Sequence, residues 1–323
     1  MPVKKKFRDI WTVVKNSFKG FSEDKVPKLS GSLSYYMIFS MGPLLLIIIT
    51  LCSAFLGREA IEGGVYRQLA GFVGSDTAAQ LQQIIKNASL SGKTTIATVI
   101  GVITLLIGAT TVFGEMQDSI NMIWGVKAKP KKNWLKFLQD RFISFSVIIS
   151  LSFLLLVSLG ISALIEGFGN YLTGKFPGVA VIVFYIINLL ITMGITSFIF
   201  SIIFKVLPDA QIRWKDVYAG AVVTTILFLL GKFGISFYIS KTSVGSTYGP
   251  AGSLIILIVW IYYSAMILYF GAEFTKAYAI QFGAPIHPSK YAVAIEQVEK
   301  EKENVSIQQN EEKKEEKKAA QKS

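Results

Sequence analysis

Long, uninterrupted apolar runs dominate the chain between residues 33 and 280. The apolar positions do not repeat every 2 or 3.6 residues, as they do in half-buried strands and helices. Each run has about 18 residues or more, enough to cross roughly 30 Å of hydrocarbon as a helix. We therefore predict an all-α, polytopic membrane protein with about six transmembrane helices. The predicted spans are Leu33–Leu56, Thr95–Trp124, Phe142–Ile165, Val179–Leu207, Val217–Ser240 and Ser253–Ile280.

The composition fits a membrane protein better than a soluble one. Of the 323 residues, 52% are hydrophobic and the mean hydropathy is +0.49, whereas soluble domains contain about 45–50% apolar residues. The polar, basic N-terminus shows no cleavable signal peptide, so we expect the first span to remain in the mature protein. Cys52 is the only cysteine, which excludes an intrachain disulfide and a thiolate metal site.

The distribution of lysine and arginine predicts the orientation in the membrane. The segments before the first span and after the second and fourth carry 17 of these residues, and the three opposite segments carry 6. The positive-inside rule then places both termini in the cytoplasm, in a multi-pass protein of the cytoplasmic membrane. We interpret the net charge of +12 as a topology signal and as contacts with anionic lipid headgroups at the cytoplasmic face, not as nucleic-acid binding.

The chain divides into three predicted regions. Residues 1–32 form a basic cytoplasmic segment, 33–282 the six-helix domain, and 283–323 a charged, solvated cytoplasmic tail with no catalytic role. Residues 57–93 form the longest outer segment, in which Asp76 is suited to cap a helix. That helix can rest on the membrane surface and cover the bundle, or serve as a lid or partner site.

Ionisable and amide side chains within the spans are the candidate functional residues, because charges there are costly and usually face inward. Glu115 and Asp118 share one helix face, where they bind a cation or relay protons, or else simply meet headgroup water at the end of the span. Lys232 lies in the outer half of the fifth span and needs a partner, such as Asn188 or a bound anion. The candidate pathway residues are Glu115, Asp118, Asn121, Asn188, Lys232 and Glu273.

Helix-breaking residues mark two candidate hinges. Pro43 removes a backbone donor inside the first span and predicts a kink, which is common in cavity-lining helices and also in plain packing. Gly249 and Pro250 precede the sixth span, where a hinge and a tight interhelical turn explain them equally well.

Three spans share a Gly-Ala pair, at Gly108-Ala109, Gly220-Ala221 and Gly271-Ala272. Small residues are common where membrane helices touch. We interpret the pairs as helix-contact residues rather than as an internal repeat.

Several motifs together resemble the YihY/virulence factor BrkB family. They are Leu33-Ser-Tyr-Tyr-Met-Ile-Phe-Ser-Met-Gly-Pro-Leu-Leu, Ala109-Thr-Thr-Val-Phe, Asn121-Met-Ile-Trp124, Leu207-Pro-Asp, Trp214-Lys-Asp-Val-Tyr-Ala-Gly-Ala221, Tyr248-Gly-Pro-Ala-Gly-Ser-Leu, Trp260-Ile-Tyr-Tyr-Ser-Ala and Gly271-Ala-Glu-Phe. The match covers about Lys15–Phe282 and departs from the family at Gly31-Ser32 and Ser34, where alanines are usual. The resemblance implies a six-helix bacterial inner-membrane protein, a candidate transporter without an agreed substrate. Some positions of this chain match residues that mark the family, and the resemblance assigns no chemical role to any of them. They are Pro43, Asn121, Trp124, Pro208, Gly249, Trp260 and Glu273.

The same family has carried the label ribonuclease BN, which the residues do not support. A metal-dependent nuclease needs clustered histidine and acidic ligands, and His287 is the only histidine. The chain also lacks a P-loop, a Ser/His/Asp set and a dinucleotide fingerprint, so we expect neither an enzyme nor a cofactor. The leading hypothesis is a permease-like or lipid- or ion-handling protein; the alternative is a non-transporting scaffold or envelope assembly factor.

Overall fold

The computed structural model describes residues 3–56, 58–89, 95–129, 134–135, 138–154, 157, 177–241 and 250–295, and it is mostly helical. The helices are α1 (Val3–Glu23), α2 (Val26–Leu56), α3 (Arg58–Val73), α4 (Ser75–Ser89), α5 (Thr95–Ile123), α7 (Pro177–Val206), α8 (Trp214–Lys241) and α10 (Pro250–Phe282). Residues 138–154 are also helical. The short strands are β1 (Val126–Ala128), β2 (Ala210–Gln211), β3 (His287–Pro288) and β4 (Ala292–Ala294).

Five predicted spans coincide with α2, α5, α7, α8 and α10, and part of the third coincides with the helix at 138–154. The rest of Phe142–Ile165 lies outside the described residues. α2 begins earlier than expected, at Val26, because the turn that precedes it ends at Lys25, whose φ is 52°. Within the described residues, three stretches are long and apolar enough to cross a membrane: Ile186–Val206, Trp214–Ile235 and Leu254–Phe282.

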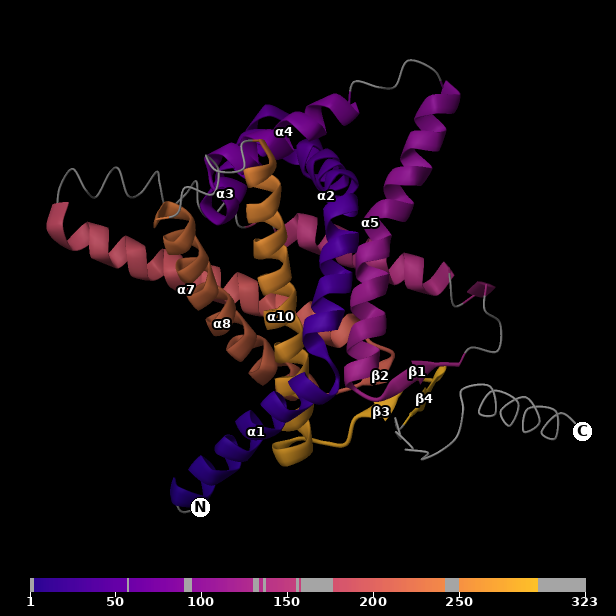
Figure 1. Ribbon diagram of the computed structural model, residues 1–323, viewed down its shortest axis with the longest axis vertical. Helices are drawn as coiled ribbons and strands as arrows, with labels where there is room; N and C mark the ends of the chain where they lie inside the picture. The colour runs from indigo at the N-terminus through magenta and orange to yellow at the C-terminus, as the bar shows by residue number, and fades with distance from the viewer. Residues whose placement is uncertain are drawn as a thin grey trace, which may run out of the picture.

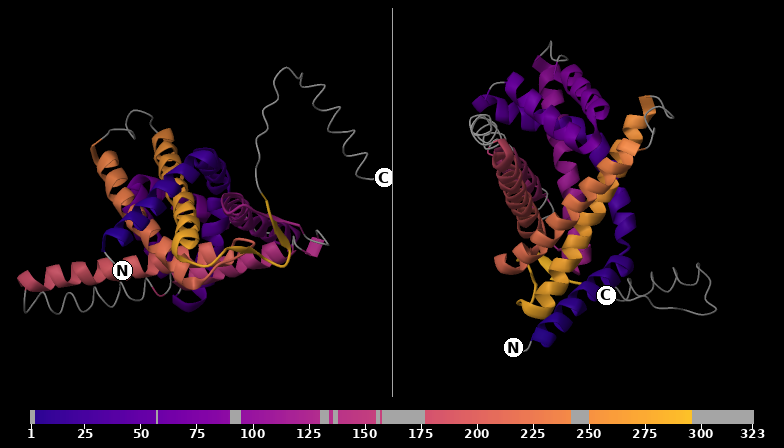
Figure 2. Two further views of the ribbon diagram at one scale, coloured as in Figure 1. Left: turned by 90° about the horizontal axis from the view of Figure 1, so that it is seen from below. Right: turned by 90° about the vertical axis from the view of Figure 1, so that its left-hand side faces the viewer.

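The helices α2, α5 and α10 stand beside one another, and α8 packs on α10 (Figure 1). α7 crosses α8 and lies at the edge of the molecule when it is seen from below (Figure 2). α3 and α4 lie at one end of this bundle, and α1 and the four strands lie at the other end (Figure 1). We call the second end the sheet end.

The outer segment at residues 57–93 forms the helices α3 and α4, joined at Gly74, whose φ of 84° favours glycine. Asp76 was expected to cap this helix, but α4 begins one residue earlier, at Ser75, so Asp76 lies inside its first turn and Gly74 precedes the helix. Ala78 and Leu81 of α4 are buried in a small hydrophobic cluster with Trp260 of α10. This contact agrees with a helix that covers the end of the bundle.

The C-terminal segment is ordered further than we predicted. β4 pairs antiparallel with β1, and β3 pairs antiparallel with β2, so the solvated tail does not start at residue 283. α10 ends at Phe282, the last residue of the predicted helical domain. The strands were not predicted because two or three residues have no detectable periodicity, and their partners lie far away in the sequence. Residues after 295 lie outside the described part.

The basic N-terminal segment contains a helix, α1, that the sequence analysis did not predict. Val13 is buried in a cluster with Phe274 and Ala277 of α10. Phe18 also packs its ring at 5.0 Å from the ring of Phe270. The N-terminal segment is therefore docked on α10 rather than extended in solvent.

The contact between α8 and α10 is reciprocal. A Cβ added to Gly220 of α8 would lie 1.8 Å from Oγ1 of Thr275, and one added to Gly271 of α10 would lie 1.9 Å from Oγ1 of Thr224. Each threonine hydroxyl donates to the carbonyl oxygen of the glycine on its own helix, at 2.7 Å in both cases. The glycines of two of the three Gly-Ala pairs thus lie where α8 and α10 touch, which agrees with the interpretation of the pairs as helix-contact residues.

We predict that Gly220→Ala lowers the free energy of unfolding by about 1–3 kcal/mol, because the new methyl group overpacks the α8–α10 contact. Gly234→Ala, on the same helix, is the matched control: no atom lies within 4 Å of its added Cβ, so it should be neutral or stabilise by up to about 1 kcal/mol. Thermal unfolding in detergent measures both. Equal unfolding temperatures for the two variants would contradict the reciprocal contact.

Candidate functional site

A polar face runs along the last part of α10, at the sheet end. Tyr269, Glu273 and Lys276 follow one another at spacings of four and three residues, which puts them on one side of the helix. Tyr269 is fully buried and Glu273 is only 2% exposed. An acid so deeply buried in a membrane-span candidate is costly, which makes this face a candidate functional site.

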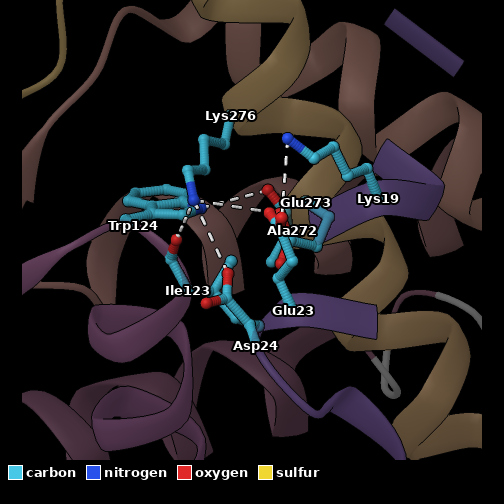
Figure 3. A network of polar contacts seen from close by, with 8 residues as sticks. All are labelled: Lys19, Glu23, Asp24, Ile123, Trp124, Ala272, Glu273 and Lys276. Carbon is cyan, nitrogen blue, oxygen red and sulfur yellow. Dashed lines mark hydrogen bonds and ion pairs between the residues drawn. The ribbon is translucent and has the colours of Figure 1, made fainter. Parts of the chain in front are cut away.

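The ammonium group of Lys276 joins three parts of the chain (Figure 3). Its Nζ lies 3.6 Å from Oδ2 of Asp24, in the turn between α1 and α2, and 4.0 Å from Oε2 of Glu273. It also donates to the carbonyl oxygen of Ile123, the last residue of α5, at 2.5 Å. A cation at this helix C-terminus satisfies an orphan carbonyl and the helix dipole together.

Trp124 reinforces the junction between α5 and α10. Its indole Nε1 donates to the carbonyl oxygen of Ala272 at 3.1 Å, directly before Glu273 (Figure 3). The backbone of α10 at this point is therefore fixed to the end of α5.

The carboxylate of Glu273 is covered by α1. A Cβ on Gly20 would lie 2.4 Å from Oε2 and 3.0 Å from Oε1, so the glycine lets the backbone of α1 approach the carboxylate. Oε1 has no hydrogen-bond partner among the described residues. Leaving a buried polar atom unsatisfied costs about 1–3 kcal/mol, and such atoms often mark functional sites.

A second polar network links α5 to the loop before β2. Asn121 accepts from the backbone N–H of Asp209 at 2.8 Å and donates from Nδ2 to Oδ2 of the same residue at 3.1 Å. Gln117 donates from Nε2 to Asp209 at 3.3 Å and to Asp140 at 3.4 Å. The carbonyl oxygen of Asp209 accepts from the N–H of Ser289, so this network also holds the C-terminal segment.

The structure brings only some of the predicted candidates together. Asn121 lies in the network around Asp209, and Glu273 lies in the network around Lys276. The hydrogen bond from Trp124 to Ala272 connects the end of α5, near Asn121, to α10 beside Glu273. On α5, Glu115 is half-buried and Asp118 is exposed. Neither side chain takes part in the hydrogen bonds and ion pairs given above for the two networks.

The other predicted candidates lie elsewhere. Lys232 of α8 is half-buried and follows Gly231, which contacts Tyr263 of α10. Tyr263 lies ten residues before Glu273, a distance of about 15 Å along α10, so Lys232 is at a different level of the bundle. Asn188 is exposed on α7 and accepts from the hydroxyl of Thr192 at 3.4 Å. The expected pairing of Lys232 with Asn188 stays a prediction.

The predicted hinge residues are placed only in part. α2 continues through Pro43 as one helix, and Pro250 is the first residue of α10. Gly249 lies outside the described residues.

Sequence reasoning missed Gly20, Asp24, Lys276 and Gln117. Lys276 follows Glu273 at i+3, a spacing that could have identified it. Gly20 and Asp24 gave no such signal, because their partner lies about 250 residues away in the chain. No group of three His, Cys, Asp or Glu side chains that could hold a metal ion occurs in the described part of the chain.

We predict that Asn121→Ala lowers the free energy of unfolding by about 2 kcal/mol, because it leaves the backbone N–H and the carboxylate of Asp209 without their partner. Asn188→Ala, the exposed counterpart, should change stability by less than about 0.5 kcal/mol. Chemical denaturation in detergent measures both. Similar losses for the two variants would show that the network around Asp209 contributes nothing.

We predict that Gly20→Ala speeds amide hydrogen exchange throughout α1 by about tenfold, because its methyl group displaces α1 from the carboxylate of Glu273. Gly31→Ala is the control, since no atom lies within 4 Å of its added Cβ. Exchange is followed by mass spectrometry on the full chain. Unchanged protection of α1 in Gly20→Ala would rule out this close contact.

Comparison with known proteins identifies the family of the chain. The family model "Virulence factor BrkB" matches residues 17–295. No solved structure matches the chain.

Bacterial relatives described as UPF0761 membrane proteins match most of the chain. One from Alteromonas mediterranea is 24% identical over 261 residues, which cover 80% of this chain and 84% of the relative. One from Tolumonas auensis is 27% identical and covers 78% of this chain and 80% of the relative. One from Ralstonia nicotianae is 26% identical over 77% of this chain and 55% of its own length. The chain is a mostly helical, multi-pass membrane protein that belongs to the virulence factor BrkB family.

Proposed function

We propose that the protein is a permease-like carrier of ions or lipids in the cytoplasmic membrane, with six transmembrane helices and both termini in the cytoplasm. In this proposal the sheet end faces the cytoplasm, and α1 closes the inner end of the path by covering Glu273.

The positions of the basic segments support this orientation. The N-terminal helix α1, the strand β1 with Lys127 and the segment from Lys205 to Lys215 all lie at the sheet end (Figure 1). These segments were assigned to one side of the membrane from charge alone. Their gathering at one end of the bundle is what the positive-inside rule requires.

The single observation that carries the proposal is the buried carboxylate of Glu273. It is 2% exposed, and one of its oxygens has no hydrogen-bond partner among the described residues. The neighbouring cation, Lys276, also contacts Asp24 and the carbonyl oxygen at the end of α5. A purely structural position would be more stable with an apolar side chain. Buried acids of this kind are typical of ion and proton paths through membranes.

The covering contact explains how a path could open without unfolding the bundle. α1 reaches Glu273 with the backbone of Gly20, while α5 and α10 hold each other independently through Trp124 and Ala272. Withdrawal of α1 would expose the carboxylate to the cytoplasm and leave the hydrogen bond between α5 and α10 intact.

An alternative function, a non-transporting scaffold or envelope assembly factor, is favoured by α7. Its large apolar side chains at Val183, Ile186, Leu190 and Phe198 are exposed, and they could contact another protein instead of lipid. Crosslinking with mass spectrometry in membranes should then yield one stoichiometric partner on α7.

We predict that the purified protein in liposomes conducts ions or scrambles lipids above the level of protein-free liposomes, and that Glu273→Gln reduces this rate at least tenfold. The amide keeps the size of the side chain and removes the ionisable carboxyl group, so the unfolding temperature should stay within a few degrees of the original. Glu23→Gln is the control, because Glu23 is a neighbouring acid whose side chain is 62% exposed. Background rates in the unmodified protein, or full activity in Glu273→Gln, would contradict the proposal.

A further inference from the structure

The helix α1 has an exposed aromatic edge beside its contact with α10, and only one ring of this edge, that of Phe18, also touches α10. Trp11 and Phe18 are two turns apart and are 64% and 61% exposed. Next to this aromatic edge, on the adjoining face of the helix, lie the exposed side chains of Arg8, Lys15 and Lys19. The edge therefore combines large apolar groups with three cations.

The opposite side of α1 fixes the direction of this edge. Val13 and Ser17 are buried, and Val13 packs against Phe274 and Ala277 of α10. A helix held in this way cannot turn its aromatic edge into the bundle. Trp11, Arg8 and Lys15 therefore face whatever surrounds the protein at the sheet end, and so does Lys19, which also pairs with Glu23 at 3.5 Å.

The level of α1 along α10 indicates what surrounds it. α10 has 33 residues and is about 50 Å long, roughly 20 Å more than the hydrocarbon core requires. The candidate span Leu254–Phe282 has 29 residues and is about 43 Å long, so a core of about 30 Å that begins at Leu254 ends near Glu273, and Lys276 lies beyond it. The ring of Phe18 contacts Phe270, and Val13 packs against Ala277, so this part of α1 lies beside the last turns of α10, where the lipid headgroups begin.

We propose that the edge of α1 formed by Trp11 and Phe18, with Arg8, Lys15 and Lys19, docks on the anionic cytoplasmic leaflet and binds the phosphate groups of anionic phospholipids. Aromatic rings favour the interface between hydrocarbon and water, and lysine and arginine beside them attract negatively charged headgroups. The proposal rests on the orientation given above, but not on transport.

Quenching of Trp11 by brominated lipids tests this docking on the full chain in lipid nanodiscs. The signal of Trp11 is the difference between the protein and its Trp11→Phe variant, because the chain has 5 tryptophans. Quenching is compared between brominated phosphatidylglycerol and brominated phosphatidylcholine in otherwise identical mixtures. We expect phosphatidylglycerol to be enriched around Trp11 at least fivefold, since each cation near the surface contributes about fivefold.

Charge variants identify the cause of the enrichment. Replacing Arg8, Lys15 and Lys19 together by glutamine should reduce it at least threefold, while the charge-conserving variant Arg8→Lys, Lys15→Arg, Lys19→Arg should retain it. The matched control replaces the exposed Lys127, Lys129 and Lys290 by glutamine, which removes the same charge at the sheet end away from α1. Trp11 that is not quenched by either lipid, an unchanged enrichment in the first variant, or an equal loss in the control would overturn the proposal.

A separate measurement tests the orientation. Asn16→Cys in a Cys52→Ser background should react with a membrane-impermeant maleimide in inverted vesicles and not in intact cells. The reverse pattern would overturn the orientation and with it the docking on the cytoplasmic leaflet. Loss of transport alone, with Trp11 still quenched, would contradict only the proposed function.

Discussion

The burial of one carboxylate, that of Glu273, determines how the sheet end is built. A charge in a low-dielectric environment needs neighbours of opposite charge and hydrogen-bond donors. Lys276 supplies the charge from one turn further along α10, and it also reaches Asp24 and the carbonyl oxygen of Ile123. The backbone of α1 also lies close to this carboxylate, and the glycine at position 20 leaves room for it there.

The motifs that carry the family resemblance contact one another in space. Asn121 binds Asp209 of the Leu207-Pro-Asp motif, and Trp124 binds Ala272 of the Gly-Ala-Glu-Phe motif. Gly271 of the latter motif packs against Thr224 of α8. These residues therefore join α5, α8, α10 and the loop before β2 at one end of the molecule, while side chains such as Lys232 lie at a different level of the bundle.

The positions of the long helices could be predicted from the sequence, because a long apolar run favours a helix whatever its neighbours are. The start of α2 at Val26 could not, because the residues before Leu33 form no apolar run. The helix α1 was missed because its lysines lowered the average hydropathy, although Val14, Phe18 and Phe21 recur at helical spacing on one face. Strands β3 and β4 were missed because their partners, β2 and β1, are distant in sequence and their two or three residues carry no pattern.

The same distinction applies to the site. Asn121 and Glu273 were found because a polar residue in or beside an apolar span stands out. Gly20 and Asp24 matter only through contacts across the fold, which composition and spacing do not contain. Asn188 met the same sequence criterion as Asn121, yet it lies exposed on α7, because the criterion does not determine which face of a helix points inward.

The central claim is that α1 must leave α10 for the path at Glu273 to open. A disulfide between Val13→Cys and Ala277→Cys, two positions of one buried cluster, tests this in a Cys52→Ser background in liposomes. The account predicts that oxidation reduces ion flux or lipid scrambling to background and that reduction restores it. Full activity in the crosslinked protein would contradict the account.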